Sequence, residues 1–145
     1  MNRLHFSIKI KAERSKIWKA LWDESAYRDW ISVFEEDSYA ISDNWKEGGK
    51  VMFLGPGKNG IYSSVVNHIP NKIMQFKHIG IVKNGKEQPI DEETRVWSGA
   101  TETYKLLEEK DCNTLVVEID VMDEHLDFMK STFHKELVKI KNNST

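Results

Sequence analysis

The sequence predicts an α+β fold: an antiparallel sheet of about six or seven strands, one long C-terminal helix packed on it, and two short helices after the first strand. Residues 4–11 alternate between apolar and polar side chains, the pattern of a strand with one buried face. Residues 39–122 repeat this pattern in short segments separated by Gly, Pro and Asn turns, so consecutive strands need no crossover helices. Residues 124–141 carry apolar side chains at helical spacing and can cover the buried face of the sheet.

The first strand places Leu4, Phe6, Ile8 and Ile10 on one face. A short helix should follow with Ser15 as its N-cap, because apolar residues at helical spacing extend from there to Trp22. A second short helix should restart at Asp23 or Ser25. With no long loop between them, the two helices are expected to form one compact corner.

The expected strands of the middle region are residues 39–45, 50–54, 61–69, 73–81, 97–107 and 114–122. Segment 55–60, rich in Gly and Pro, should reverse the chain. Residues 82–94 are polar and contain Asn84-Gly85 and Pro89. We therefore expect a long mobile loop there, of the kind that often serves as a lid.

The strand at 97–107 is the most informative one. Strand alternation puts on one face Ser98, Ala100, Glu102, Tyr104 and Leu106. The last two side chains require a core, so Glu102 should point inward with them, beside small residues. A carboxylate in an apolar interior is costly unless it is paired or protonated. The strand therefore favours a hollow interior over a solid core.

The terminal helix should run over residues 124–141, with Asp123 as its N-cap. Acidic residues in its first turn and basic residues near its end match the helix dipole. Its apolar stripe consists of Leu126, Met129, Phe133, Leu137 and Ile140. Phe128 lies off this stripe, either as an ordinary exposed residue or as a contact in a homodimer. Residues 142–145 are expected to fray.

Composition predicts one domain over residues 1–145. A net charge of −2 gives no basic excess for binding nucleic acid or an anionic membrane. The lone Cys112 makes no internal disulfide, and no Cys/His spacing resembles a metal site, so we expect neither metal nor cofactor. The sequence shows no transmembrane-length apolar run and no signal peptide. We therefore expect a cytoplasmic protein without integral membrane association.

Several segments carry a family resemblance through their order and spacing. They are Ile17-Trp18-Lys19-Ala20-Leu21 followed by Tyr27 and Trp30, the Trp45 and Gly48-Gly49 segment, residues 70–76, and residues 97–104. Over nearly its whole length the chain resembles the START/Bet v 1-like (SRPBCC) superfamily, and within it the activator-of-Hsp90-ATPase-homologue-1-like group. The resemblance implies a helix-grip fold, in which a curved antiparallel sheet wraps around the C-terminal helix and leaves a cavity between them.

Members of that superfamily often bind lipids, sterols, polyketides or other apolar molecules, and some act as cyclases or aromatases. The resemblance therefore implies that this chain binds a small hydrophobic molecule between the sheet and the last helix, without catalysis. One alternative is a polyketide cyclase/aromatase-like enzyme. Another is an Hsp90-related co-chaperone or interaction module that uses exposed aromatic residues.

The face assignments send a set of side chains toward the interior: Phe53, Tyr62, Met74, Phe76, His78, Glu102, Tyr104, Met129 and Phe133. The place of Tyr62 depends on the register of its strand, in which Ser63 and Val65 would serve about as well. His78 and Glu102 are the only acid–base pair that can be placed inside, and together they could move a proton or polarise a carbonyl. The alternative is a buried pair that only fixes the sheet. A hydrolytic triad is disfavoured, because no Gly-x-Ser-x-Gly elbow is present and Ser63 has no base beside it in the sequence.

Overall fold

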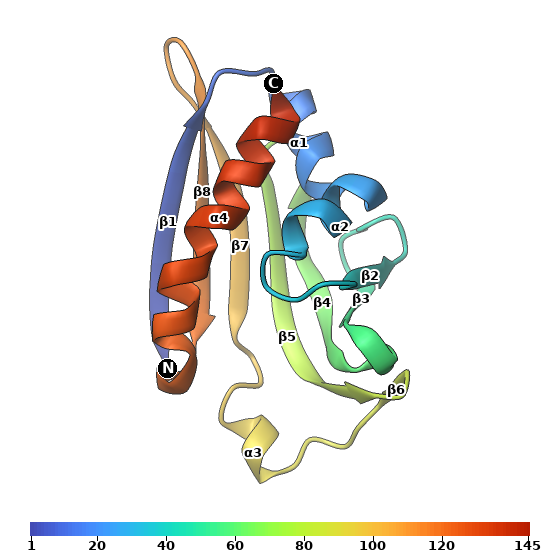
Figure 1. Cartoon of the computed structure of the whole chain (residues 1–145). Helices are drawn as coiled ribbons and strands as arrows, with labels where there is room; N and C mark the ends of the chain where they lie inside the picture. Colours follow the sequence, from blue (N-terminus) through green and yellow to red (C-terminus); the bar gives the residue numbers. More distant parts are fainter.

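The computed structural model describes the whole chain, residues 1–145 (Figure 1). Its strands are β1 (Asn2–Ile10), β2 (Tyr39–Ser42), β3 (Lys50–Leu54), β4 (Gly60–Ile69), β5 (Ile73–Lys83), β6 (Lys86–Glu87), β7 (Thr101–Glu108) and β8 (Asn113–Val121). Its helices are α1 (Arg14–Trp22), α2 (Glu24–Ile31), α3 (Glu92–Arg95) and α4 (Leu126–Ser144), with short 3₁₀ turns at η1 (Pro56–Lys58) and η2 (Asp123–His125).

The strands form one antiparallel sheet in the order β1-β8-β7-β5-β4-β3-β2, with β6 paired to the end of β5. Helix α4 runs along one face of this curved sheet, and α1 and α2 lie beside it (Figure 1). The predicted α+β architecture, a sheet that wraps around a long C-terminal helix after two short helices, is confirmed. None of the helices has both the length and the apolar content that crossing a membrane requires.

The core fills the space between the sheet and the helices. Burial alternates along β1, as its apolar–polar pattern predicts, and the inner residues of β5, Met74 and Phe76, are fully buried. From α4, the apolar stripe contributes Phe133, Leu137 and Ile140. Phe6 of β1 stacks on Phe133 with ring centroids 4.3 Å apart, which ties the edge strand to the helix.

Two β-bulges in the β4–β5 pair decide which side chains face inward. Tyr62 pairs with Gly80 and the next residue, Ser63, pairs with His78, so Ile79 is the extra residue on β5. Ser63 therefore lies on the inner face, whereas Tyr62 packs on the outer face with Leu54 and Val82. The other bulge is at Val66 of β4, and it brings Ser63 rather than Ser64 opposite His78. The expectation that Tyr62 faces the interior is wrong, because this extra residue interrupts the alternation that the expectation used.

The strand expected at 97–107 begins only at Thr101. Residues 97–100 instead form a tight turn, in which the backbone N–H groups of Trp97 and Ser98 both donate to the carbonyl of Thr94. Gly99 then adopts φ +97°, a conformation that side chains with a Cβ rarely reach. Glu102 keeps its predicted inward direction, because it lies within the strand proper.

Residues 82–94 contain more regular structure than the long loop that the sequence suggested. Asn84 and Gly85 both have positive φ and make a two-residue hairpin turn between β5 and β6. Asp91 then caps α3 by accepting a hydrogen bond of 2.8 Å from the backbone N–H of Thr94.

The helix ends also differ from the expectations. Ser15 lies inside α1, whose N-cap is Glu13, and Asp123 lies inside η2 rather than capping α4. The segment 142–145 does not fray, because α4 continues to Ser144, which is 2% exposed. Phe128 is exposed and packs edge-on against Phe34.

Candidate functional site

His78 and Glu102 lie side by side on the inner face of the sheet. Strand β5 carries His78 and β7 carries Glu102, and Nε2 of the ring is 3.2 Å from Oε1 of the carboxyl group. His78 is 7% exposed, and the side chain of Glu102 is 21% exposed. Because a carboxylate only accepts hydrogen bonds, the imidazole donates from Nε2.

The other nitrogen of the His78 ring contacts Ser63, whose Oγ is 2.6 Å from Nδ1. In a neutral ring that donates from Nε2, Nδ1 is an acceptor, so the hydroxyl group of Ser63 donates to it. Ser63 is fully buried and lines neither of the two hollows that flank this site. The Ser–His–Glu row therefore positions the imidazole and offers no nucleophile that a substrate could reach. The pairing of Ser63 with His78 depends on the bulge at Val66, and the alternation in the sequence carries no signal of it.

A second carboxyl group, that of Glu136 on α4, reaches the same site. It is fully buried, its Oε1 lies 3.2 Å from the Tyr104 hydroxyl oxygen, and its Oε2 has no hydrogen-bond partner. Burial, reinforced by the negative charge of Glu102, raises the pKa of Glu136 well above its ordinary 4.5. Sequence reasoning missed this residue. The available signal was its spacing, three residues after Phe133 and four before Ile140, which places it on the buried stripe of the helix.

Two buried tyrosines complete the polar group. The hydroxyl of Tyr104 donates to Oε2 of Glu102 over 2.5 Å. Burial, followed by the charges of Glu102 and Glu136, raises the pKa of Tyr104 well above 10.0, and the same causes act on Tyr27. Both phenols therefore keep their protons at neutral pH.

Two hollows meet at this polar group. The larger, of about 650 Å³, opens near α3 and the start of α4; its apolar lining includes Ile61, Val96, Trp97, Ala100, Ile119 and Met129. The smaller, of about 290 Å³, lies beneath α2 and is lined by aromatic residues that include Trp22, Tyr27, Trp30, Phe53 and Phe76. Ile61, His78 and Glu102 line both hollows, so the polar group stands at their junction.

The remaining predicted cavity residues divide into two groups. Phe53 and Phe76 line the smaller hollow, and Met129 lines the larger one. Met74, Tyr104 and Phe133 are at most 1% exposed and belong to the packed core around the hollows. Tyr62 lies on the opposite face of the sheet.

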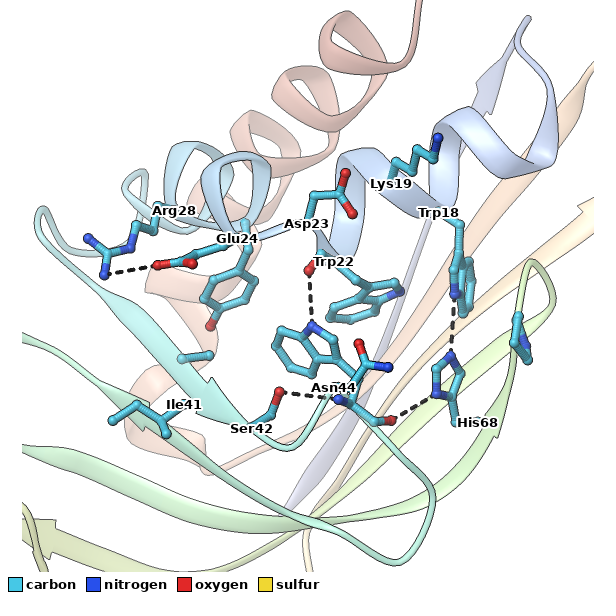
Figure 2. A pocket seen from close by; sticks show the side chains of 14 residues that line it. Trp18, Lys19, Trp22, Asp23, Glu24, Arg28, Ile41, Ser42, Asn44 and His68 are labelled. Atoms are coloured by element: carbon cyan, nitrogen blue, oxygen red, sulfur yellow. Dashed lines mark hydrogen bonds and ion pairs between the residues drawn. The ribbon is translucent and has the colours of Figure 1, made fainter.

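Figure 2 shows a separate open pocket of about 620 Å³ between α1, α2 and the β2–β3 connection. Trp18 donates from Nε1 to Nε2 of His68 over 3.4 Å, and His68 Nδ1 lies 2.8 Å from the Trp45 carbonyl oxygen (Figure 2). The rim of this pocket carries charges of both signs, including an ion pair of Glu24 with Arg28. Of the buried titratable groups named above, only Tyr27 lines this pocket, whereas His78 and Glu102 both line the inner hollows. The junction of the two inner hollows is therefore the stronger candidate site.

A curved antiparallel sheet that grips a long C-terminal helix defines the helix-grip fold. The chain has this fold, and comparison with solved structures confirms it. No family model matches the sequence, and no curated protein matches it.

Among the similar solved structures is the Aha1 dimer from Colwellia psychrerythraea, 23% identical, with a TM-score of 0.69 over 98% of this chain and 95% of that one. Protein MLL2253 from Mesorhizobium loti is 12% identical, with a TM-score of 0.71 over 98% and 96% of the two chains. CalU16 from Micromonospora echinospora is 16% identical, with a TM-score of 0.66 over 99% and 76%. At these identities the likeness establishes the fold alone.

Proposed function

We propose that this protein binds a small hydrophobic molecule in the joined hollows between the sheet and the helices that cover it. The observation that carries the proposal is the meeting of two hollows at His78 and Glu102, inside an otherwise packed core. The larger hollow has a volume within the range of small-molecule sites, roughly 300–1,000 Å³. Nine of its 15 lining residues are hydrophobic, which is the composition of a site that takes an apolar body and fixes it at a few polar points.

The test begins with native mass spectrometry of the protein purified from cells, followed by calorimetric titration with a panel of lipids, sterols and aromatic compounds. Bound ligand should be lost in Met129→Trp, which places a larger side chain in the larger hollow. Phe128→Trp is the matched control, because it adds a similar side chain to the exposed face of the same helix. Binding that survives Met129→Trp, or the absence of any ligand in either assay, contradicts the proposal. The same spectra give the number of chains per particle and so test the homodimer suggested by Phe128.

A second candidate function is proton transfer on the bound molecule by His78 and Glu102, as in a cyclase or aromatase. It is favoured by one observation: both side chains line the two hollows, so a ligand that spans the junction touches an acid–base pair. Once a ligand is known, it should be converted by the natural protein and only bound by His78→Gln or Glu102→Gln, as followed by the mass of the recovered molecule. Recovery of the unchanged ligand from the natural protein would leave binding as the sole function.

A further inference from the structure

We propose that the ligand carries a hydrogen-bond-donating head, an amine in preference to an alcohol, and that carboxylates and phosphates are excluded. This inference rests on the proposed function and specifies its ligand. The charged side chains that line the two hollows are all acidic apart from histidine: Glu35, Glu93, Glu102, Asp120 and Glu124. Met1, which carries the N-terminal amino group, also lines the larger hollow. Neither a lysine nor an arginine is among the lining residues of either hollow.

Glu102 is the acid that a ligand head would meet at the junction. Asp120 is already paired, since its Oδ1 lies 2.9 Å from Nε of Arg3, and Glu93 and Glu124 are exposed at the rim. Each oxygen of Glu102 receives one hydrogen bond, Oε1 from His78 and Oε2 from Tyr104. A carboxylate has about four acceptor positions, so each oxygen can accept a further donor from a ligand.

The aromatic residues around Glu102 favour a positive charge on that donor. The smaller hollow presents the rings of Trp22, Tyr27 and Trp30 from the helices and of Phe53 and Phe76 from the sheet. Aromatic faces attract cations, and a carboxylate among them neutralises an ammonium group that has left water. The smaller hollow, with a volume of about 290 Å³, fits a small head group, while the larger apolar hollow accommodates a hydrocarbon body.

The same surroundings oppose an anionic head. A ligand carboxylate at the junction would lie beside Glu102, and neither hollow has a lining lysine or arginine to pair with it. Like charges that share a site with little water repel strongly, and an unpaired buried anion is costly by itself. An anionic ligand would therefore have to take up a proton in order to bind.

The test compares four ligands with the same hydrocarbon chain: decylamine, decyltrimethylammonium, 1-decanol and decanoate, each titrated calorimetrically at pH 7. Decylamine should bind at least about tenfold more tightly than decanoate, as expected for a hydrogen bond to a charged partner, with decanol between the two. Decyltrimethylammonium has the positive charge but no N–H to donate, so it should bind more tightly than decanoate and more weakly than decylamine. Glu102→Gln should reduce the preference to within about twofold. Glu118→Gln is the matched control, because it removes an equal charge on β8 that is paired with Lys105 and lines neither hollow.

Decanoate that binds as tightly as decylamine, or more tightly, overturns the inference and leaves the proposed function standing. This comparison uses the natural protein, so it remains decisive even if Glu102→Gln does not fold. A preference for cations that persists unchanged in both Glu102→Gln and Met129→Trp indicates surface binding and also overturns it. If none of the four ligands binds, decanol included, both the proposed preference for a donating head group and the proposed binding of a hydrophobic molecule are contradicted.

Discussion

Glu102 and Glu136 share one hydroxyl group: the phenol oxygen of Tyr104 lies 2.5 Å from Oε2 of Glu102 and 3.2 Å from Oε1 of Glu136. A phenol has a single proton and cannot donate to both carboxyl groups. Because its contact is the shorter one, Glu102 is the carboxyl group that accepts the hydrogen bond from the phenol. Glu136, whose pKa is raised, then keeps its own proton and donates it to the phenol oxygen. The result is a directed chain of hydrogen bonds from Glu136 through Tyr104 to Glu102 at the cavity end.

Replacement of Glu136 by Gln should stabilise the protein increasingly as the pH rises. In the folded state Glu136 holds its proton above the ordinary pKa of 4.5, whereas the unfolded chain releases it there, so folding becomes less favourable with increasing pH. Gln keeps the shape of the protonated acid and has no proton to release. The difference in unfolding free energy, measured by urea denaturation, should grow by up to ~1.4 kcal/mol per pH unit above 4.5. A gap that stays constant from pH 4 to pH 8 would show that Glu136 is ionised in the folded protein.

Tyr104→Phe should destabilise the protein by about 1–3 kcal/mol, because it leaves two carboxyl groups without their shared partner. The loss should depend on Glu136. In a double-mutant cycle with Glu136→Gln, the coupling energy should reach at least ~0.5 kcal/mol, as expected for residues in one hydrogen-bond network. Additive losses within the error of the denaturation curves would mean that the phenol and Glu136 do not interact.

Asp120→Asn should show the opposite pH dependence. Partial burial raises the pKa of Asp120, but hydrogen bonds from Arg3 and from the backbone and side chain of Thr101 lower it more, to below its ordinary 3.8. Its contribution to stability is therefore present above pH 3.8 and is lost as the pH falls through the lowered pKa. At pH 7 the variant should lose about 1 kcal/mol, since Arg3 is half exposed, and the loss should shrink in acid. Thermal melts from pH 2 to pH 7 provide the measurement, and a loss that grows in acid would refute this assignment.

Gly80→Ala should destabilise the β4–β5 pair by about 1–3 kcal/mol. The ring of Tyr62 covers Gly80, and a Cβ atom there would lie 2.7 Å from Cε1 of that ring. An aromatic residue packed over a glycine on the neighbouring strand is a known way of securing such a pair. In a Tyr62→Leu background the same substitution should cost clearly less in urea denaturation. An equal cost in the natural protein and in the Tyr62→Leu variant would show that the strain arises in the backbone at position 80 and not from contact with the Tyr62 ring.

The fold was predictable because burial repeats along each element. The alternation in β1 and the helical stripe of Phe133, Leu137 and Ile140 are one-dimensional patterns, and the family resemblance depended on their order. The inward direction of Glu102 followed from the same alternation, with Tyr104 as its inward neighbour two residues later.

The site was less predictable because it depends on departures from those patterns. The extra residue Val66 on β4 shifts the register against β5, so that Ser63 pairs with His78 and faces inward while Tyr62 faces outward. The turn at Gly99 delays the start of the expected strand until Thr101. Glu136 has the spacing of the buried stripe of α4, but a glutamate is ordinarily an exposed residue of a helix, and the contact with Tyr104 shows why it is buried here.

The distribution of the five tryptophans gives the molecule two separate optical reporters. Trp18, Trp22, Trp30 and Trp45 belong to one connected aromatic cluster, in which excitation passes between neighbouring rings. Trp97 lies outside that cluster, half-buried at the wall of the larger hollow. Emission from the cluster should follow unfolding of the core, whereas quenching of Trp97 should follow entry of a guest molecule. Replacing Trp97 with Phe would separate the two signals without the need for an added dye.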